Sequence, residues 1–279
     1  MITIPMSEIP NSFIEKCKAR LEPYTTTLIK MCRKHQHKYE INQIGSGTFV
    51  KIGNLHAILT ANHVSRELDD DCDLGMTLQE AEHRPVFQRS LLKIIPVGVS
   101  SDEAIGPDLS LIVLVESEVS RIKPYKSFLD LNHDIDRLLN HPPPIENGVW
   151  FVCGTVDILT RQTRSEKGFD KAFSFQGYCF STGVSNYFVR NGFDYFEADV
   201  NKENAVNMPE KFQGISGGGL WQILCRKTED NFEILDWFLS GVVFYQTEWV
   251  GAKCFIRCHG RRSIYERVVA QMEALAKTV

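Results

Sequence analysis

The sequence predicts an all-β protein with helical termini. Two short runs of apolar and β-branched residues, 55–60 and 109–115, have the length and composition of buried strands. Glycines cluster at 214–219, as expected at a tight turn between strands. Near the end of the chain, apolar residues recur at helical spacing instead, at Ile264, Val268, Met272 and Leu275.

The remaining elements can be placed in chain order. We expect a helical N-terminal extension over residues 1–37, whose segment 7–36 has an intermittent apolar face; Pro23 kinks it or divides it into two helices. Residues 118–147 contain several prolines and are expected to link two β-rich units, with a short helix near 134–139. A polar surface loop over 160–172, a hairpin turn over 226–231 and a C-terminal helix over 261–279 complete the prediction.

Three segments hold residue types suited to nucleophilic catalysis. His63 follows the first predicted strand, Asp108 opens the second, and Ser216 lies among glycines. A serine hydroxyl is a weak nucleophile until a base takes its proton and a third group orients that base. Each segment also has a plain structural explanation: a hydrogen-bonded histidine at a strand end, an aspartate capping a turn, and a glycine turn.

The order of the three residues favours the catalytic interpretation. Histidine, aspartate and serine follow one another at separations of 45 and 108 residues. An α/β-hydrolase places its serine before the acid and the histidine, so the order disfavours that fold. A buried aspartate at a strand end also needs a partner, and a histidine N–H is a suitable one.

In these motifs the chain resembles the trypsin/chymotrypsin-like serine peptidases. The resemblance covers about residues 38–279 and implies two six-stranded antiparallel Greek-key barrels. Barrel one would span 38–117 and supply His63 and Asp108, the linker 118–147, barrel two 148–260 with Ser216, and the C-terminal helix 261–279. Segments 149–154, 239–244 and 255–258 are similar to strands of the family's second barrel.

The resemblance implies a serine endopeptidase that acts through an acyl-enzyme and needs no cofactor. His63 would accept the proton of Ser216, Asp108 would orient His63, and the amides of Gly214 and Ser216 would form the oxyanion hole. Counting back from the serine suggests Glu210 at the base of the specificity pocket, which would favour Lys or Arg in the substrate. An exposed loop around Glu210 is the alternative. A second set of residues is expected to border an extended polypeptide substrate: Phe244, Tyr245 and Gln246.

Departures from the digestive proteases indicate a different subtype. Ile215 occupies the position of their acidic residue before the serine, so activation by a newly cut N-terminus is not expected. The motif is similar to that of bacterial HtrA-type proteases, but no PDZ-like region follows the predicted C-terminal helix. The overall likeness is to stand-alone intracellular bacterial trypsin-like peptidases.

Composition sets limits on partners and compartment. The net charge of −4 gives no reason to expect nucleic acid or an anionic membrane as a partner. The sequence shows no secretory signal and no apolar run long enough to span a membrane, which predicts a cytoplasmic protein. Its eight cysteines are then expected to be reduced thiols, several of them in the core.

Two groups have metal-ligating residue types: Cys254 with Cys258 and His259, and Cys32 with His35 and His37. Neither has the paired spacing of a zinc finger or ribbon. We therefore expect core cysteines and surface histidines, with no metal.

Two other functions remain open. The chain could be a latent protease effector of a stress or defence system, which a protein partner activates by docking on the N-terminal helices; the glycine-rich loop motivates this hypothesis. It could also be a binding module that keeps the fold without activity. Comparing Ser216→Ala with wild type in cleavage and in partner binding separates these classes.

Overall fold

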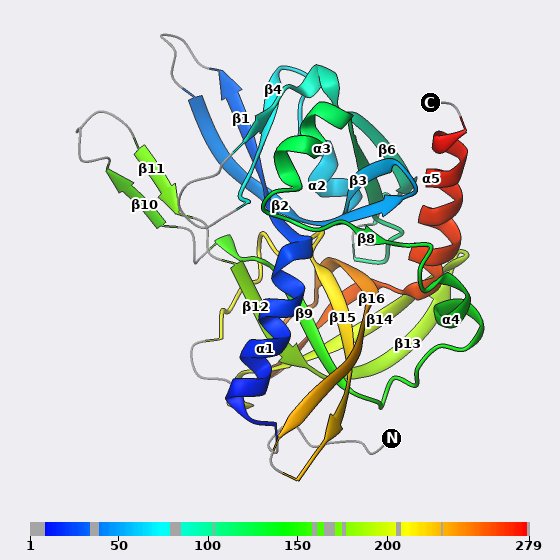
Figure 1. Cartoon of the computed structure of the whole chain (residues 1–279). Helices are drawn as coiled ribbons and strands as arrows, with labels where there is room; N and C mark the ends of the chain where they lie inside the picture. The colour runs from blue at the N-terminus through cyan, green and yellow to red at the C-terminus, as the bar shows by residue number, and fades with distance from the viewer. Residues whose placement is uncertain are drawn as a thin grey trace.

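Strands dominate the structure and form two antiparallel sheets, one of which curves into a half-barrel (Figure 1). The computed structural model describes residues 9–33, 39–78, 85–102, 104–157, 161–164, 171–174, 177–204, 208–229 and 231–277. Within these residues the first sheet has eight strands and the second has seven, not the six in each that the sequence resemblance implied.

The first sheet is built from the N-terminal half of the chain. Its order is β5-β4-β1-β2-β3-β7-β6, and β8 pairs with β2 in parallel. Two helices follow strands of this sheet: α2 (Asn62–Arg66) and α3 (Glu116–Ile122). The strands are β1 (Thr25–Arg33), β2 (Tyr39–Ile52), β3 (Leu55–Thr60), β4 (Cys72–Met76), β5 (Val86–Phe87), β6 (Lys93–Gly98), β7 (Leu109–Leu114) and β8 (Leu129–Asp130).

The second sheet comes from the C-terminal half, in the order β12-β9-β15-β16-β17-β14-β13. The short strands β10 (Arg161–Arg164) and β11 (Lys171–Ser174) pair only with each other. The sheet strands are β9 (Val149–Thr155), β12 (Gly177–Thr182), β13 (Val184–Arg190), β14 (Phe193–Asn201), β15 (Gly219–Lys227), β16 (Phe232–Gln246) and β17 (Lys253–His259).

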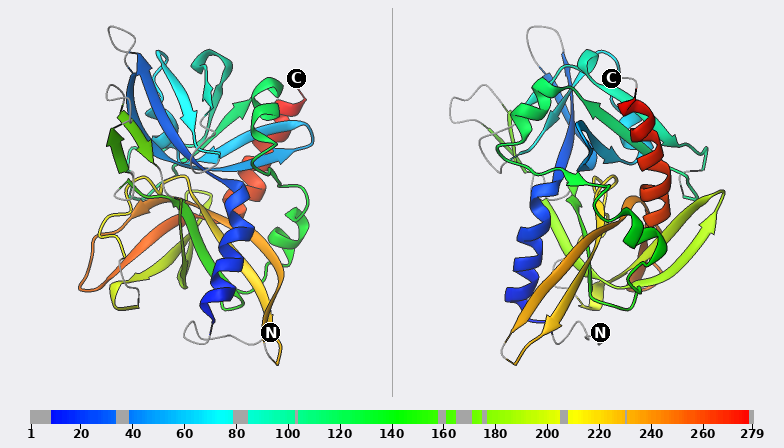
Figure 2. Two further views of the ribbon diagram at one scale, coloured as in Figure 1. Left: turned by 60° about the vertical axis from the view of Figure 1, so that its left-hand side comes forward. Right: turned by 45° about the vertical axis from the view of Figure 1, so that its right-hand side comes forward.

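Helices flank the sheets on two sides (Figure 2). Helix α1 (Asn11–Leu21) runs along the second sheet, where Phe13 packs against Phe232 with ring centroids 5.4 Å apart. The C-terminal segment is helical, as predicted: a π-helical stretch (Ser263–Val268) contacts β14, and α5 (Val269–Ala276) contacts β2 and β3. The short helix of the linker is α4 (Ile135–Asn140), close to its predicted place.

The N-terminal extension is only partly helical. Helix α1 ends at Leu21, a 3-10 turn follows over Glu22–Tyr24, and β1 begins at Thr25. The prediction of helix through residue 36 was therefore wrong, because three consecutive threonines favour an extended backbone beyond Pro23. The first sheet consequently begins at residue 25 rather than 38. Residues 1–8 and 34–38 lie outside the described residues.

One apolar cluster joins the two sheets. It combines Leu59 and Leu111 of the first sheet with Phe151, Trp221 and Leu239 of the second, all fully buried. The buried face of α1 and the C-terminal helical segment contribute to the same cluster. Because this shared core is closely packed, it sets the position of one sheet relative to the other, and hence of the residues where the two sheets meet.

Four of the eight cysteines are paired in disulfides, contrary to the expectation of reduced thiols. Cys32 of β1 is bonded to Cys72 of β4, and Cys153 of β9 to Cys179 of β12. In both pairs the residues lie directly opposite each other on neighbouring antiparallel strands, which brings their side chains within bonding reach. The other four are buried thiols, as expected of core cysteines: Cys17, Cys225, Cys254 and Cys258.

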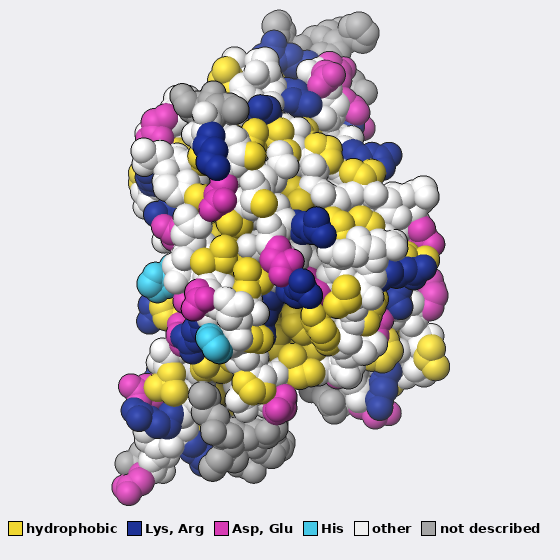
Figure 3. Space-filling view, turned by 90° about the vertical axis from the view of Figure 1, so that its right-hand side faces the viewer, with side chains coloured by type: hydrophobic (Ala, Val, Ile, Leu, Met, Phe, Trp, Pro, Cys, Tyr) yellow, Lys and Arg dark blue, Asp and Glu magenta, His cyan; other side chains and the backbone are white. Residues whose placement is uncertain are grey.

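Surface charge is mixed on the face that carries α5. Figure 3 shows Lys and Arg side chains interspersed there with Asp and Glu, with apolar side chains between them. None of the helices in the described ranges has the length and apolar character needed to span a bilayer.

Candidate active site

Sheet register brings His63 and Asp108 together. Strands β3 and β7 are antiparallel neighbours in which Thr60 lies opposite Ser110. The chain just beyond the end of β3 therefore lies beside the chain just before the start of β7. His63 is in the first turn of α2, three residues after Thr60, and Asp108 immediately precedes β7. A hydrogen bond of 3.0 Å from Ser65 Oγ to Ser110 Oγ packs α2 onto β7.

The carboxylate of Asp108 accepts two hydrogen bonds from His63. Asp108 Oδ1 accepts a hydrogen bond of 2.8 Å from the His63 backbone N–H, and Asp108 Oδ2 accepts one from His63 Nδ1. The Asp108 side chain is 7% exposed and that of His63 is 29% exposed. A buried carboxylate on Nδ1 selects the tautomer in which Nδ1 carries the proton and Nε2 is the basic nitrogen.

Ser216 lies in the turn that precedes β15, between the two sheets. The Ser46 N–H of β2 donates a 2.7 Å hydrogen bond to Ser216 O. Directly after the serine, the Gly217 N–H donates to Val243 O at 2.8 Å, and the Val243 N–H donates to Gly218 O at 2.9 Å. The serine backbone is thus held by the first sheet, and the glycines after it are held by β16 of the second.

Glycine is required in this turn because neighbouring backbone lies very close. Gly214 and Gly217 have φ of +92° and +86°, values that L-residues rarely adopt. A Cβ atom on Gly217 would also overlap Ser46 O and Thr60 Oγ1. The turn is therefore packed against its surroundings, which explains the glycine run in physical terms.

Ser46 connects the serine turn to both sheets and was not identified from the sequence. Its hydroxyl donates to Gly214 O at 2.8 Å and accepts from the Thr155 N–H at the same distance. Its own carbonyl accepts a 2.7 Å hydrogen bond from Thr60 Oγ1, and the residue is fully buried. The local sequence Gly45-Ser46-Gly47 resembles the serine turn itself and was the available signal.

Two backbone amides of the serine turn have no acceptor among the described residues: the N–H groups of Gly214 and Ser216. Asp157 lies beside this turn, where its backbone N–H donates to Gln213 O at 2.8 Å. Asp157 Oδ1 is buried and has no hydrogen-bond partner among the residues that the structure describes, and desolvation raises the pKa of this carboxyl. A carboxyl with a raised pKa next to the turn was another feature that sequence reasoning missed.

A cavity of about 520 Å³ lies beside His63 and Ser216. Four buried apolar side chains contribute to its lining: Phe212, Ile215, Val243 and Ile256. The predicted substrate-binding residues Phe244, Tyr245 and Gln246 also line it. Gln246 accepts a 2.9 Å hydrogen bond from the Phe212 N–H and donates to Glu210 O at 3.3 Å, so its amide ties the cavity wall together.

Glu210 does not lie at the base of this cavity. Its backbone contributes to the wall, where Trp249 Nε1 donates to Glu210 O at 2.6 Å. Its carboxylate is 85% exposed and lies 3.5 Å from Lys202 Nζ. The exposure of Glu210 and Lys211 agrees with the exposed-loop alternative, although Pro209 beside them is buried.

The groups with metal-ligating residue types have other roles. Cys32 is disulfide-bonded, and His35 and His37 lie outside the described residues. His259 Nε2 accepts a 2.9 Å hydrogen bond from the Asp108 N–H instead of facing the thiols of Cys254 and Cys258.

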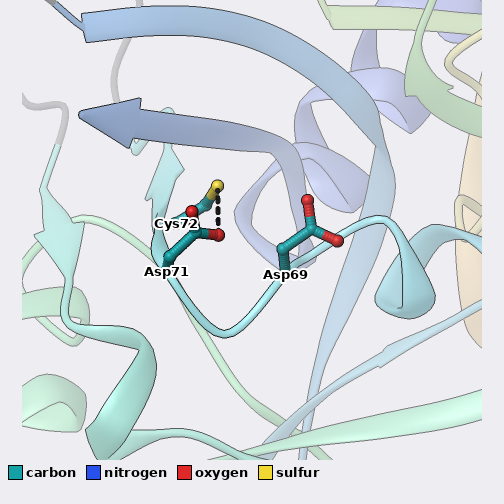
Figure 4. Close-up of side chains that lie close together, drawn as sticks. All are labelled: Asp69, Asp71 and Cys72. Atoms are coloured by element: carbon teal, nitrogen blue, oxygen red, sulfur yellow. Dashed lines mark hydrogen bonds between the residues drawn. The ribbon is translucent and has the colours of Figure 1, made fainter. Parts of the chain in front are cut away.

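A further cluster of potential ligands lies where β4 begins (Figure 4). Its members are Asp69, Asp71 and Cys72, and Cys72 Sγ is 3.4 Å from Asp71 Oδ1. The sulfur is part of a disulfide, so it has no proton to donate to that carboxylate and is no thiolate ligand. Asp69 pairs with Lys30. The cluster is thus two exposed aspartates beside a buried disulfide sulfur.

No protein-family model matches the chain, and the search of curated proteins found no match.

Proposed function

We propose that this chain is a serine endopeptidase of the chymotrypsin-like type. The observation that carries the proposal is the buried Asp108 carboxylate bound to His63 Nδ1, at the edge of a cavity that Ser216 also lines. Two antiparallel sheets packed through a common core are compatible with that fold. In the proposed architecture each sheet corresponds to one Greek-key barrel, and the site lies between them.

The proposed reaction proceeds in two stages. His63 Nε2 takes the proton of Ser216 Oγ as this oxygen bonds to the scissile carbonyl carbon; the same proton then passes to the leaving amine as the C–N bond breaks. Water next attacks the acyl-enzyme, gives a proton to His63, and releases the acid as the proton returns to Ser216 Oγ. These steps involve no metal or cofactor. Asp108 orients the ring and stabilises its cation throughout.

The amides of Gly214 and Ser216 are the proposed oxyanion hole. Their support is that neither N–H has an acceptor among the described residues, so both are available to a developing negative charge. Ser46 is suited to maintain this arrangement, because it binds the carbonyl oxygens of both residues. Backbone donors held before the reaction lose no energy to reorganisation during it.

The proposed substrate is a polypeptide with an uncharged, apolar residue on the acyl side of the scissile bond. Phe212, Ile215, Val243 and Ile256 would surround that side chain. A lysine or arginine among these apolar side chains would lose its hydration, and the Glu210 carboxylate faces solvent beside Lys202. This proposal differs from the basic specificity that counting back from the serine suggested.

A fluorophosphonate probe tests the activity directly. Wild type is expected to be labelled, whereas Ser216→Ala and His63→Ala are not, and the exposed-serine control Ser90→Ala is labelled like wild type. The loss of kcat in a cleavage assay should be on the order of 10⁶-fold for Ser216→Ala. Folded wild type without labelling would overturn the proposal of a constitutively active enzyme.

Specificity is tested separately with peptide chloromethyl ketones that carry Leu, Phe, Lys or Arg next to the reactive group. Leu and Phe reagents are expected to inactivate wild type fastest, and Glu210→Ala should leave the order unchanged. Faster reaction with Lys or Arg that disappears in Glu210→Ala would restore the basic-specificity hypothesis.

A further inference from the structure

We propose that His259 is a positioning residue, which holds Asp108 in the orientation that His63 requires. The inference rests on the proposed function and extends it to a residue in the second sheet. His259 is the last residue of β17, and 151 positions separate it from Asp108.

The contact is specific in its atoms. His259 Nε2 accepts a 2.9 Å hydrogen bond from the Asp108 backbone N–H, while both carboxylate oxygens of Asp108 accept hydrogen bonds from His63. His259 of the second sheet thus holds the Asp108 backbone, and His63 of the first half of the chain holds its side chain. A rotation that carries the Asp108 carboxylate away from His63 would therefore also strain the hydrogen bond to His259.

The imidazole ring of His259 is itself fixed by packing. It is fully buried, and the rings of Phe244, Tyr195 and Phe193 lie around it with centroid separations of 4.8, 5.1 and 5.7 Å. Strand β17 is also paired on both sides, with His259 opposite Tyr195 in β14 and Val242 in β16. The acceptor nitrogen consequently has little freedom to move.

The hydrogen bond also determines the protonation of the ring. A neutral imidazole has one donor and one acceptor nitrogen, so an accepting Nε2 places the proton on Nδ1. Nδ1 has no hydrogen-bond partner within the described part of the chain. Burial lowers the pKa of His259 to about 4, which keeps the ring neutral near pH 7. Burying the unpaired Nδ1–H costs free energy. The hydrogen bond that Nε2 accepts from Asp108 is therefore the feature that accounts for a histidine at this position.

Substitutions can separate the hydrogen bond from the packing. His259→Phe keeps a planar aromatic ring and removes the acceptor, whereas His259→Gln places an amide oxygen near the former Nε2 position. We expect His259→Phe to lower kcat by roughly 10- to 100-fold with little change in KM, because a supporting hydrogen bond acts through the group that it orients. His259→Gln is expected to recover most of that loss.

A matched control is available in His56. This histidine is also buried, contacts the ring of Phe128 at 4.7 Å, and bonds Asn54 O at 2.8 Å. His56→Phe should leave kcat at the wild-type value. Equal kcat in His259→Phe and wild type, or equal losses in His259→Phe and His259→Gln, would overturn the inference.

Two measurements do not depend on turnover. Histidine-selective ¹⁵N NMR of wild type should find His259 protonated at Nδ1 and unprotonated at Nε2; the opposite tautomer would contradict the proposal even if His259→Phe does not fold. The deshielded proton between His63 Nδ1 and Asp108 Oδ2 should shift in His259→Phe and persist in His259→Gln. A wild type that is not labelled by fluorophosphonate, but that shows this tautomer and this proton shift, would overturn the proposed function and leave the role of His259 in positioning Asp108 intact.

Discussion

At the residue scale, the site depends on a few groups whose chemistry is recognisable and on others that only support them. His63, Asp108 and Ser216 have residue types and an order that suggest a triad. Ser46 and His259 are not part of that ordered set, yet Ser46 binds the backbone at Gly214 and Ser216, and His259 binds the backbone at Asp108. A single sequence does not reveal the supporting role of such residues, because that role is defined by contacts between distant segments.

Glycine at position 217 should be the most sensitive residue of the serine turn. Gly217→Ala adds a Cβ that overlaps Ser46 O and Thr60 Oγ1 at a positive φ, so we expect a loss of about 3 kcal/mol or more in unfolding free energy. Gly53→Ala is the control, since Gly53 also has a positive φ but no atom within 4 Å of the added Cβ; it should lose only about 1 kcal/mol. Urea unfolding of both variants measures the difference. Equal losses would mean that the turn is not packed against Ser46.

At the element scale, the N-terminal segment shows that local apolar spacing does not always decide between helix and strand. Residues 11–21 form a helix whose buried positions Phe13, Cys17 and Leu21 are four residues apart. Beyond Pro23 the threonines turn the chain into β1, which then pairs with β2 and β4. The apolar residues 28 and 29 suit either a helix or a strand, so only the strand neighbours decide between them.

Helix α1 should behave as part of the core rather than as a detachable arm. Phe13 is fully buried against Phe232, so Phe13→Ala is expected to cost about 3–5 kcal/mol of unfolding free energy. Lys16→Ala on the exposed face of the same helix should change stability by less than about 0.5 kcal/mol. Chemical denaturation measures both. A small effect of Phe13→Ala would instead support a loosely attached helix that is available for docking a partner.

At the scale of the whole molecule, the two sheets meet at the proposed site. The shared apolar cluster packs them together, Ser46 links the serine turn to β2 and β9, and His259 links β17 to Asp108. Assembly of the site therefore requires both halves to be folded and docked. This makes the site sensitive to conditions that charge a group buried between the halves.

Stability should fall as the pH drops from about 6.5 toward 4. The pKa of His259 is lowered from 6.5 to about 4 in the folded state, because burial penalises its charged form. The unfolded chain thus binds a proton in this range that the native state does not, which favours unfolding. Between pH 7 and pH 5 this difference amounts to about 2 kcal/mol.

His259→Gln provides the comparison for this pH effect, because it removes the titrating ring and retains an acceptor. Denaturant titrations of wild type and variant at pH 7 and pH 5 should show a smaller loss of unfolding free energy in the variant. Parallel losses in both proteins would show that His259 is protonated alike in the folded and unfolded states.

The sequence by itself determined the features that depend on local pattern and residue chemistry. The strands at 55–60 and 109–114, the C-terminal helix and the candidate triad all follow from periodicity, turn residues and the order of three reactive side chains. Each of these signals is contained within a few neighbouring residues, apart from the order of the triad.

Only the tertiary structure decided which distant segments meet. Sheet register placed His63 beside Asp108, paired Cys32 with Cys72, and converted residues 25–33 into a strand. Packing of the two sheets brought Ser46 and His259 to the site, and a surface loop directed the Glu210 carboxylate into solvent. The physical reason is that these outcomes depend on strand pairing and burial across many residues, which a local pattern does not specify.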